Sequence, residues 1–127
     1  MVRYDVAHAV SRLGQYNQKP TEGSRLALMG VLGYMGGSAD FKIEGTVEGE
    51  PDKIRIKSQS TYSDSDHGGD RHLTTRSQSG TMILLNGVPV HWRSSKQPVT
   101  ALSTCSAVAE IYALSEAIKS GRLFQWR

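Results

Sequence analysis

Apolar residues recur at steps of three and four over two segments near the start of the chain, and this spacing predicts two amphipathic helices. The first covers residues 6–16 and ends before the polar stretch 17–20. The second begins at Pro20-Thr21-Glu22, which offers a capping hydroxyl and an acid in the first turn, and it ends at Gly36-Gly37. Its expected core face consists of Leu28, Val31, Leu32 and Met35.

The middle of the chain changes to alternation of apolar and polar residues, which indicates strands with one buried face. The segments DFKIEGT (40–46) and KIRIK (53–57) predict a hairpin, and SQSTYSD (58–64) predicts a separate strand. A second hairpin is predicted over residues 80–92. Its turn is Asn86-Gly87, the strongest short hairpin signal in the chain.

A third helix is predicted to begin near Ser103, whose hydroxyl can cap it. Its apolar stripe, and hence its expected core face, consists of Val108, Ile111, Tyr112, Ser115 and Ile118. The chain then ends on the apolar residues Leu123, Phe124 and Trp126. The order of helices and strands predicts an α+β domain preceded by a helical pair.

Composition narrows the class of protein. The length of 127 residues fits one compact domain, or a small domain with an added element, and the formal charge of +3 permits a polyanionic partner without requiring one. Cys105 is the single cysteine, which excludes a disulfide framework. No run approaches the ~20 apolar residues that cross a bilayer, so no membrane insertion is expected. The N-terminus lacks a secretion signal, so an intracellular location is expected.

The acidic stretch TYSDSDHGGD, residues 61–70, is the main candidate for chemistry. A calcium loop starting at Asp64 fails, because Gly68 and Thr75 occupy its fifth and twelfth positions, and the histidines have no zinc spacing. Two interpretations stay open. One is a solvated turn; the other is that Asp64 faces Glu110 across a strand–helix interface, where two carboxylates can hold magnesium.

Three motifs in order carry a resemblance to a known family: TYSDSDHGGD, then RSQSGTMILLNGVPVHWRSSKQPVTALS at 76–103, then AEIYALSEAI at 109–118. Residues 58–127 resemble the ribonuclease H domain of copia-type LTR retrotransposon Pol polyproteins. Residues 1–40 are similar to the helical pair, thumb or connection, at the end of the reverse transcriptase. The resemblance implies a truncated ribonuclease H-like domain over residues 41–127, with a mixed sheet packed on a helix.

The resemblance also implies an activity, the magnesium-dependent hydrolysis of the RNA strand of RNA–DNA hybrids. Asp64 matches the carboxylate that bridges two Mg²⁺ ions, Glu110 matches the helix carboxylate, and Asp66 matches a second aspartate of the metal-binding motif. Arg93, Ser94, Lys96 and Gln97 match the polar exit of the hairpin, which would contact the nucleic acid. Arg76 is a further candidate for nucleic-acid binding, because it can form a basic cluster with Arg71, Arg93 and Lys96.

The family's later carboxylates are missing, because the chain ends 17 residues after Glu110. We therefore expect impaired catalysis and a first strand whose outer edge lacks a neighbour. A protein partner or a second copy is expected to cover this edge and the apolar C-terminal end. The alternative function is a non-catalytic structural or interaction subunit, derived from a retroelement and held in a larger assembly.

Overall fold

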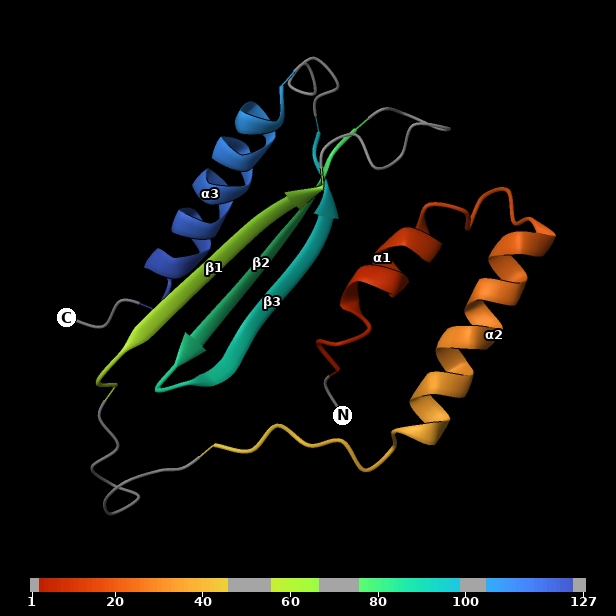
Figure 1. Cartoon of the computed structure of the whole chain (residues 1–127), viewed down its shortest axis with the longest axis horizontal. Helices are drawn as coiled ribbons and strands as arrows, with labels where there is room; N and C mark the ends of the chain where they lie inside the picture. Colours follow the sequence, from red (N-terminus) through yellow and green to blue (C-terminus); the bar gives the residue numbers. More distant parts are fainter. Residues whose placement is uncertain (1–2, 46–55, 67–75, 99–104, 125–127) are drawn as a thin grey trace. The chain divides into compact units, whose positions relative to one another are not determined.

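The computed structural model describes residues 3–45, 56–66, 76–98 and 105–124 (Figure 1). The chain forms two compact units, residues 1–42 and residues 43–127. The first unit is helical, and the second contains the sheet and the last helix.

Helices α1 (Ala7–Gly14) and α2 (Glu22–Gly37) make up the first unit. The predicted start of α2 is confirmed. The Thr21 hydroxyl accepts a hydrogen bond of 3.1 Å from the backbone N–H of Ser24, and the Ser24 hydroxyl accepts one of 2.8 Å from the backbone N–H of Thr21. This reciprocal capping box satisfies two of the N–H groups that a helix start leaves without partners.

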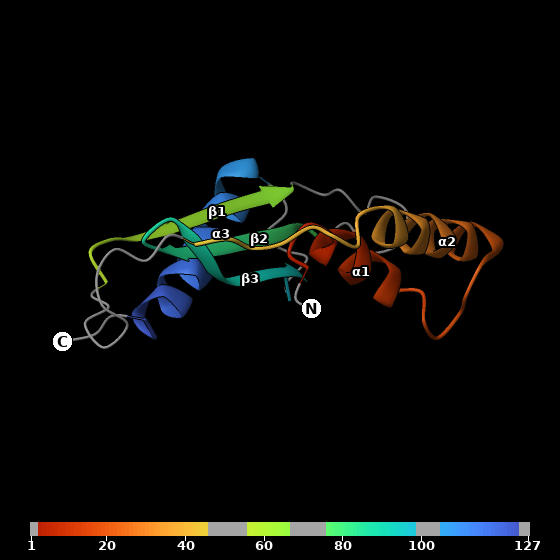
Figure 2. The same ribbon diagram turned by 90° about the horizontal axis from the view of Figure 1, so that it is seen from below.

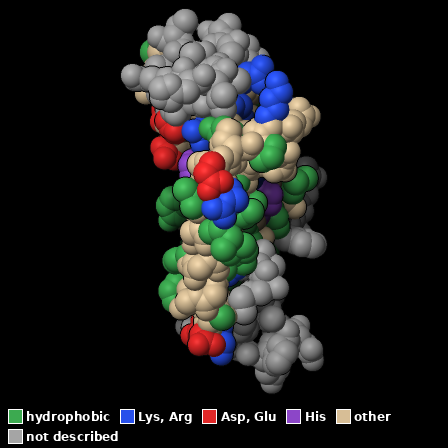
Figure 3. Space-filling view, turned by 90° about the vertical axis from the view of Figure 1, so that its right-hand side faces the viewer, with side chains coloured by type: hydrophobic (Ala, Val, Ile, Leu, Met, Phe, Trp, Pro, Cys, Tyr) green, Lys and Arg blue, Asp and Glu red, His purple; other side chains and the backbone are tan. Residues whose placement is uncertain are grey.

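The predicted core face of α2 is wrong. Leu28, Leu32 and Met35 are 46%, 52% and 37% exposed, and only Val31 is half-buried. The physical reason is the size of the covering element, since α1 has 8 residues and α2 has 16. Figure 3 views the molecule from the side of α2 and shows hydrophobic side chains open to the surface.

The second unit contains three strands, β1 (Gln59–Asp66), β2 (Gln78–Leu85) and β3 (Val88–Lys96), in the order β1-β2-β3. The strand predicted over 58–64 and the hairpin around Asn86-Gly87 are confirmed. Asn86 and Gly87 have φ angles of 50° and 81°, the left-handed backbone that the tight turn of a two-residue hairpin requires. In this part of the chain β2 is central, and β1 and β3 form the edges.

Two other strand predictions fail. The mixed sheet is wrong, because both strand pairs of the described sheet are antiparallel. The hairpin expected over residues 40–57 is not formed in its first segment, since residues 41–45 are irregular. Residues 46–55, which include most of its second segment, lie outside the described residues.

Helix α3 (Ser106–Arg122) packs against β1 and β2, as Figures 1 and 2 show. Its buried residues are small and recur every fourth position: Ala109, Ala113, Ala117 and Gly121. The predicted core stripe is therefore wrong, and Ile111 and Ile118 are 66% and 49% exposed. Small side chains let the helix backbone approach the strands closely, with Ile83 of β2 fully buried in this unit. The larger apolar residues are left on the outside.

Candidate functional site

The two aspartates of the acidic stretch lie on the side of the sheet that faces away from α3. Gln59 Nε2 donates a hydrogen bond of 2.9 Å to the backbone carbonyl of Gly121, and Thr61 Oγ1 lies 3.2 Å from where a β-carbon on Gly121 would be. These contacts fix the α3-facing side of β1. Because successive side chains of a strand point to opposite faces, Asp64 and Asp66 are on the other face, where both are exposed.

Glu110 lies on α3, half-buried beside Ala109. The structure thus does not bring Asp64 and Glu110 to a common sheet face. Among the residues that the structure describes, no three His, Cys, Asp or Glu side chains gather closely enough to hold a metal ion. A shared magnesium ion needs converging oxygen ligands, so its binding by this carboxylate pair stays a prediction.

Gln97, predicted to contact nucleic acid, is only 2% exposed. Its side-chain amide nitrogen donates hydrogen bonds of 2.9 Å to the Ser79 hydroxyl and 3.0 Å to the backbone carbonyl of Ala109. Gln97 therefore links the end of β3 to β2 and α3. Both interactions are structural, and the amide does not reach a surface where a ligand could bind.

The remaining residues of that predicted set are spread over both faces of the sheet. Arg93 is exposed on the α3 side of the sheet. The hydrogen bond from Lys119 is the main cause that lowers the pKa of Glu116 on α3, and the positive charge of Arg93 lowers it further. Ser94 accepts a hydrogen bond of 3.0 Å from Gln78. Lys96 is three positions after Arg93 on β3, so its side chain points to the opposite face of the sheet. Arg76 is half-buried just before β2. These side chains do not form one basic surface.

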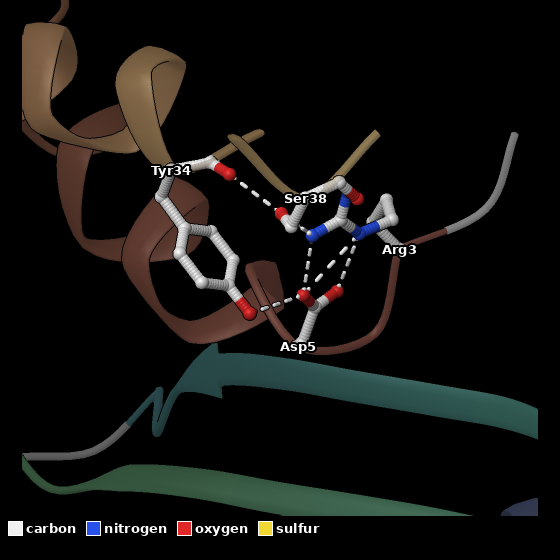
Figure 4. A network of polar contacts seen from close by, with 4 residues as sticks. All are labelled: Arg3, Asp5, Tyr34 and Ser38. Atoms are coloured by element: carbon white, nitrogen blue, oxygen red, sulfur yellow. Dashed lines mark hydrogen bonds and ion pairs between the residues drawn. The ribbon is translucent and has the colours of Figure 1, made fainter. Parts of the chain in front are cut away.

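A polar cluster in the first unit was not predicted (Figure 4). The Arg3 guanidinium holds both carboxylate oxygens of Asp5, with the shortest distance 2.6 Å, and donates hydrogen bonds to the backbone carbonyl and hydroxyl of Ser38 at 2.9 and 2.7 Å. The Tyr34 hydroxyl donates one of 2.8 Å to Asp5. The guanidinium also lies over the rings of Tyr34 and Phe41, 5.5 and 5.6 Å from their centroids.

These contacts set the charge states of the cluster. The hydrogen bonds from Arg3, followed by that from Tyr34, hold the pKa of Asp5 well below its usual range. The hydrogen bond to Asp5 raises the pKa of Tyr34. The carboxylate is thus already paired with a guanidinium and a hydroxyl, so the cluster is a structural clamp between the N-terminus and the end of α2 rather than a reactive site. No local motif signals it, because its two halves are 29 to 35 residues apart.

The outer face of α3 carries three exposed large apolar side chains and a hollow. Ile111, Leu114 and Ile118 are 66%, 51% and 49% exposed. A hollow of about 360 Å³ lies on this face, lined by Ile111, Leu114, Ser115, Ile118, Lys119 and Arg122. All six residues belong to one helix, so the hollow is an open surface feature and not an enclosed active-site cleft.

The described helices include none with the length and apolar character needed to cross a bilayer.

Comparison of the sequence with known proteins finds a relative. The chain belongs to the family of a secreted effector protein. The relative is the secreted RxLR effector protein 161 of Plasmopara viticola. It is 38% identical over 117 residues, which cover 92% of this chain and 76% of the relative. No family model matches the chain, and no solved structure matches it.

This relationship corrects three expectations from the sequence. Membership of the copia-type retrotransposon Pol polyproteins is wrong, since the family found is that of a secreted effector. The ribonuclease H function is overturned by the same finding, and no structural neighbour supports a ribonuclease H-like fold. The expected intracellular location conflicts with a relative that is secreted. The α+β class itself is confirmed, with three helices and three antiparallel strands in the described residues.

Proposed function

We propose that this protein is a secreted effector that acts by binding another protein, without catalysing a reaction. One observation carries the proposal: the described residues bury few large apolar side chains and expose many. Five hydrophobic residues are buried, and three of them are alanines, whereas 17 large hydrophobic residues are exposed.

Scattered exposed hydrophobic residues are normal, but here they are concentrated on two helices. Six lie on α2 and three on α3: Leu26, Leu28, Met29, Leu32, Tyr34 and Met35, and Ile111, Leu114 and Ile118. Apolar area contributes roughly 25 cal/mol per Å² when it leaves water. Surfaces of this kind are typical of sites that a partner protein covers.

Two further observations support a binding function over an enzymatic one. Asp64 points away from α3, the helix that carries Glu110, and the polar cluster around Arg3 is internally paired. The relative is by name a secreted effector. The 127 residues contain no Arg-X-Leu-Arg tetrapeptide, so the relationship rests on the 117 matched residues and not on that motif.

The test compares three forms of the tagged protein that carry serine on α2 (Leu28→Ser with Leu32→Ser), serine on α3 (Ile111→Ser with Ile118→Ser), or neutral carboxylates (Asp64→Asn with Glu110→Gln). We expect a protein that co-purifies with the wild-type chain in a fixed molar ratio. It should be retained by the carboxylate variant and lost from at least one serine variant. No fixed-ratio partner, or a partner retained by both serine variants, would contradict the proposal.

A further inference from the structure

We infer that the outer face of α3 is a docking site for a helix of the partner protein, and that this helix presents an apolar residue and an acidic residue one turn apart. The inference rests on the proposed binding function and specifies the surface and the chemistry of the partner.

The residues lining the hollow have the spacing of a helix-packing site. In helix–helix packing a side chain of one helix inserts into a hole formed by four residues of the facing helix. Ile111, Leu114, Ser115 and Ile118 stand at positions i, i+3, i+4 and i+7 of α3, the outline of one such hole. Ser115 is exposed and small, and it lies between the longer exposed side chains of Ile111 and Ile118. The small Ser115 side chain therefore makes the hollow deep, and the longer side chains of Ile111 and Ile118 make its rim apolar.

A second hole follows one turn later. Ser115, Ile118, Lys119 and Arg122 have the same spacing, so the six residues lining the hollow form two consecutive holes. Four residues of an α-helix rise about 6 Å, which matches the separation of two side chains one turn apart on a partner helix. This repeat favours a helix over a loop or a strand as the occupant.

The charges of the lining residues specify the second contact. The lining includes two cations, Lys119 and Arg122, and no anion. Lys119 donates a hydrogen bond of 2.7 Å to Glu116, whereas Arg122 is exposed and has no ion pair within the residues that the structure describes. The partner side chain that enters the second hole is therefore expected to be acidic. The partner side chain that enters the first hole is expected to be apolar.

The surface is available without rearrangement of the fold. The inner face of α3 is occupied by Ala109, Ala113, Ala117 and Gly121, so the outer residues make no contribution to packing against the sheet that docking would break. Preorganised surfaces bind with less loss of conformational entropy.

Two synthetic peptides provide the probe. Each has about 20 residues and is held helical by side-chain lactam bridges, because shorter free helices are marginal in water. One carries a leucine and, one turn away, a glutamate; the other replaces that glutamate by lysine. We expect the glutamate peptide to bind the full-length protein about tenfold more tightly in calorimetric titration at low salt, since attraction at Arg122 is exchanged for repulsion.

Variants locate the binding. Ser115→Trp fills the shared floor of both holes and should abolish binding of the glutamate peptide. Ser60→Trp, on an exposed residue of β1 that points away from α3, is the matched control and should leave the affinity unchanged. Arg122→Glu, in the exposed last turn, should reverse the preference between the two peptides. Far-UV circular dichroism of each variant establishes that the helices persist.

Three results would overturn the inference: neither peptide binds, both bind equally, or the glutamate peptide still binds Ser115→Trp. The co-purification test separates this failure from failure of the proposed function. If a fixed-ratio partner is lost only from the α2 serine variant, the α3 docking site is excluded but the proposed binding function is not. If no partner co-purifies in a fixed ratio, the proposed binding function itself is excluded.

Discussion

The side-chain amide of Gln97 donates a hydrogen bond of 3.0 Å to the backbone carbonyl of Ala109, and this contact joins the end of β3 to the first turns of α3. The same nitrogen donates to Ser79 of β2 at 2.9 Å. Since Gln97 is only 2% exposed, these bonds form in a buried environment where a polar group without a partner is destabilising. Gln97 therefore fixes where the N-terminal half of α3 sits on the sheet.

Gln97→Ala should lower the free energy of unfolding by roughly 1–3 kcal/mol, because it leaves the Ser79 hydroxyl and the Ala109 carbonyl without their buried donor. Urea denaturation followed by far-UV circular dichroism measures the change. Gln18→Ala, at an exposed glutamine, is the control and should be within about 0.5 kcal/mol of wild type. Equal stability of the two variants would show that Gln97 does not hold α3.

Ala113→Leu should be destabilising by about 1–3 kcal/mol, since the added side chain must enter the contact between α3 and the sheet. Leu114→Ala, at the next position on the exposed side, should change stability by no more than about 0.5 kcal/mol. The same urea titrations measure both. The opposite ranking would mean that α3 is rotated so that its large apolar residues face the strands.

The Asp5 carboxylate should make the first unit sensitive to acid. Its pKa is lowered in the folded state by Arg3, so its stabilising contribution is complete above the ordinary value of 3.8 and is lost as the pH falls below it toward the folded pKa. We expect the thermal midpoint reported by amide signals of α2 to fall below about pH 4. Asp5→Asn should remove most of this dependence, whereas Asp40→Asn, at an exposed aspartate, should retain it. Identical acid profiles for all three proteins would rule out the clamp.

Magnesium provides a separate test of the acidic stretch. Because Asp64 points away from α3, the helix that carries Glu110, we expect millimolar magnesium to leave the unfolding midpoint unchanged. A ligand that binds only the folded state stabilises it by RT ln(1 + [L]/Kd), so the unfolding midpoint rises with ligand concentration. A rise with magnesium that disappears in Asp64→Asn would show that the stretch holds a metal ion after all.

Local signals predicted the local structure of this chain. Thr21 begins α2 because its hydroxyl caps the helix, and Asn86-Gly87 makes the hairpin because both residues adopt positive φ. Each feature depends on residues within a few positions of one another.

Features that depend on distant residues were not predicted. The stripe of Ile111, Tyr112 and Ile118 satisfies the helical period, but the period alone cannot tell which face of α3 packs inward. Close approach to the strands selects the alanine face. Arg3 and Tyr34 come together only through the packing of α1 on α2, and Asp64 is separated from Glu110 by the alternation of β1. The family likewise follows from similarity over 117 residues and not from the short motifs.

The central claim is that α3 turns its alanines toward the sheet and presents Ile111, Leu114 and Ile118 to a partner. Thiol labelling tests it most directly, since Cys105 is the single cysteine and Cys105→Ser provides a silent background. In that background Ile118→Cys should react with a maleimide at the rate of a free peptide, and Ala117→Cys about a hundredfold more slowly, because it reacts only when the helix opens. Fast labelling at position 117 with slow labelling at position 118 would contradict the account.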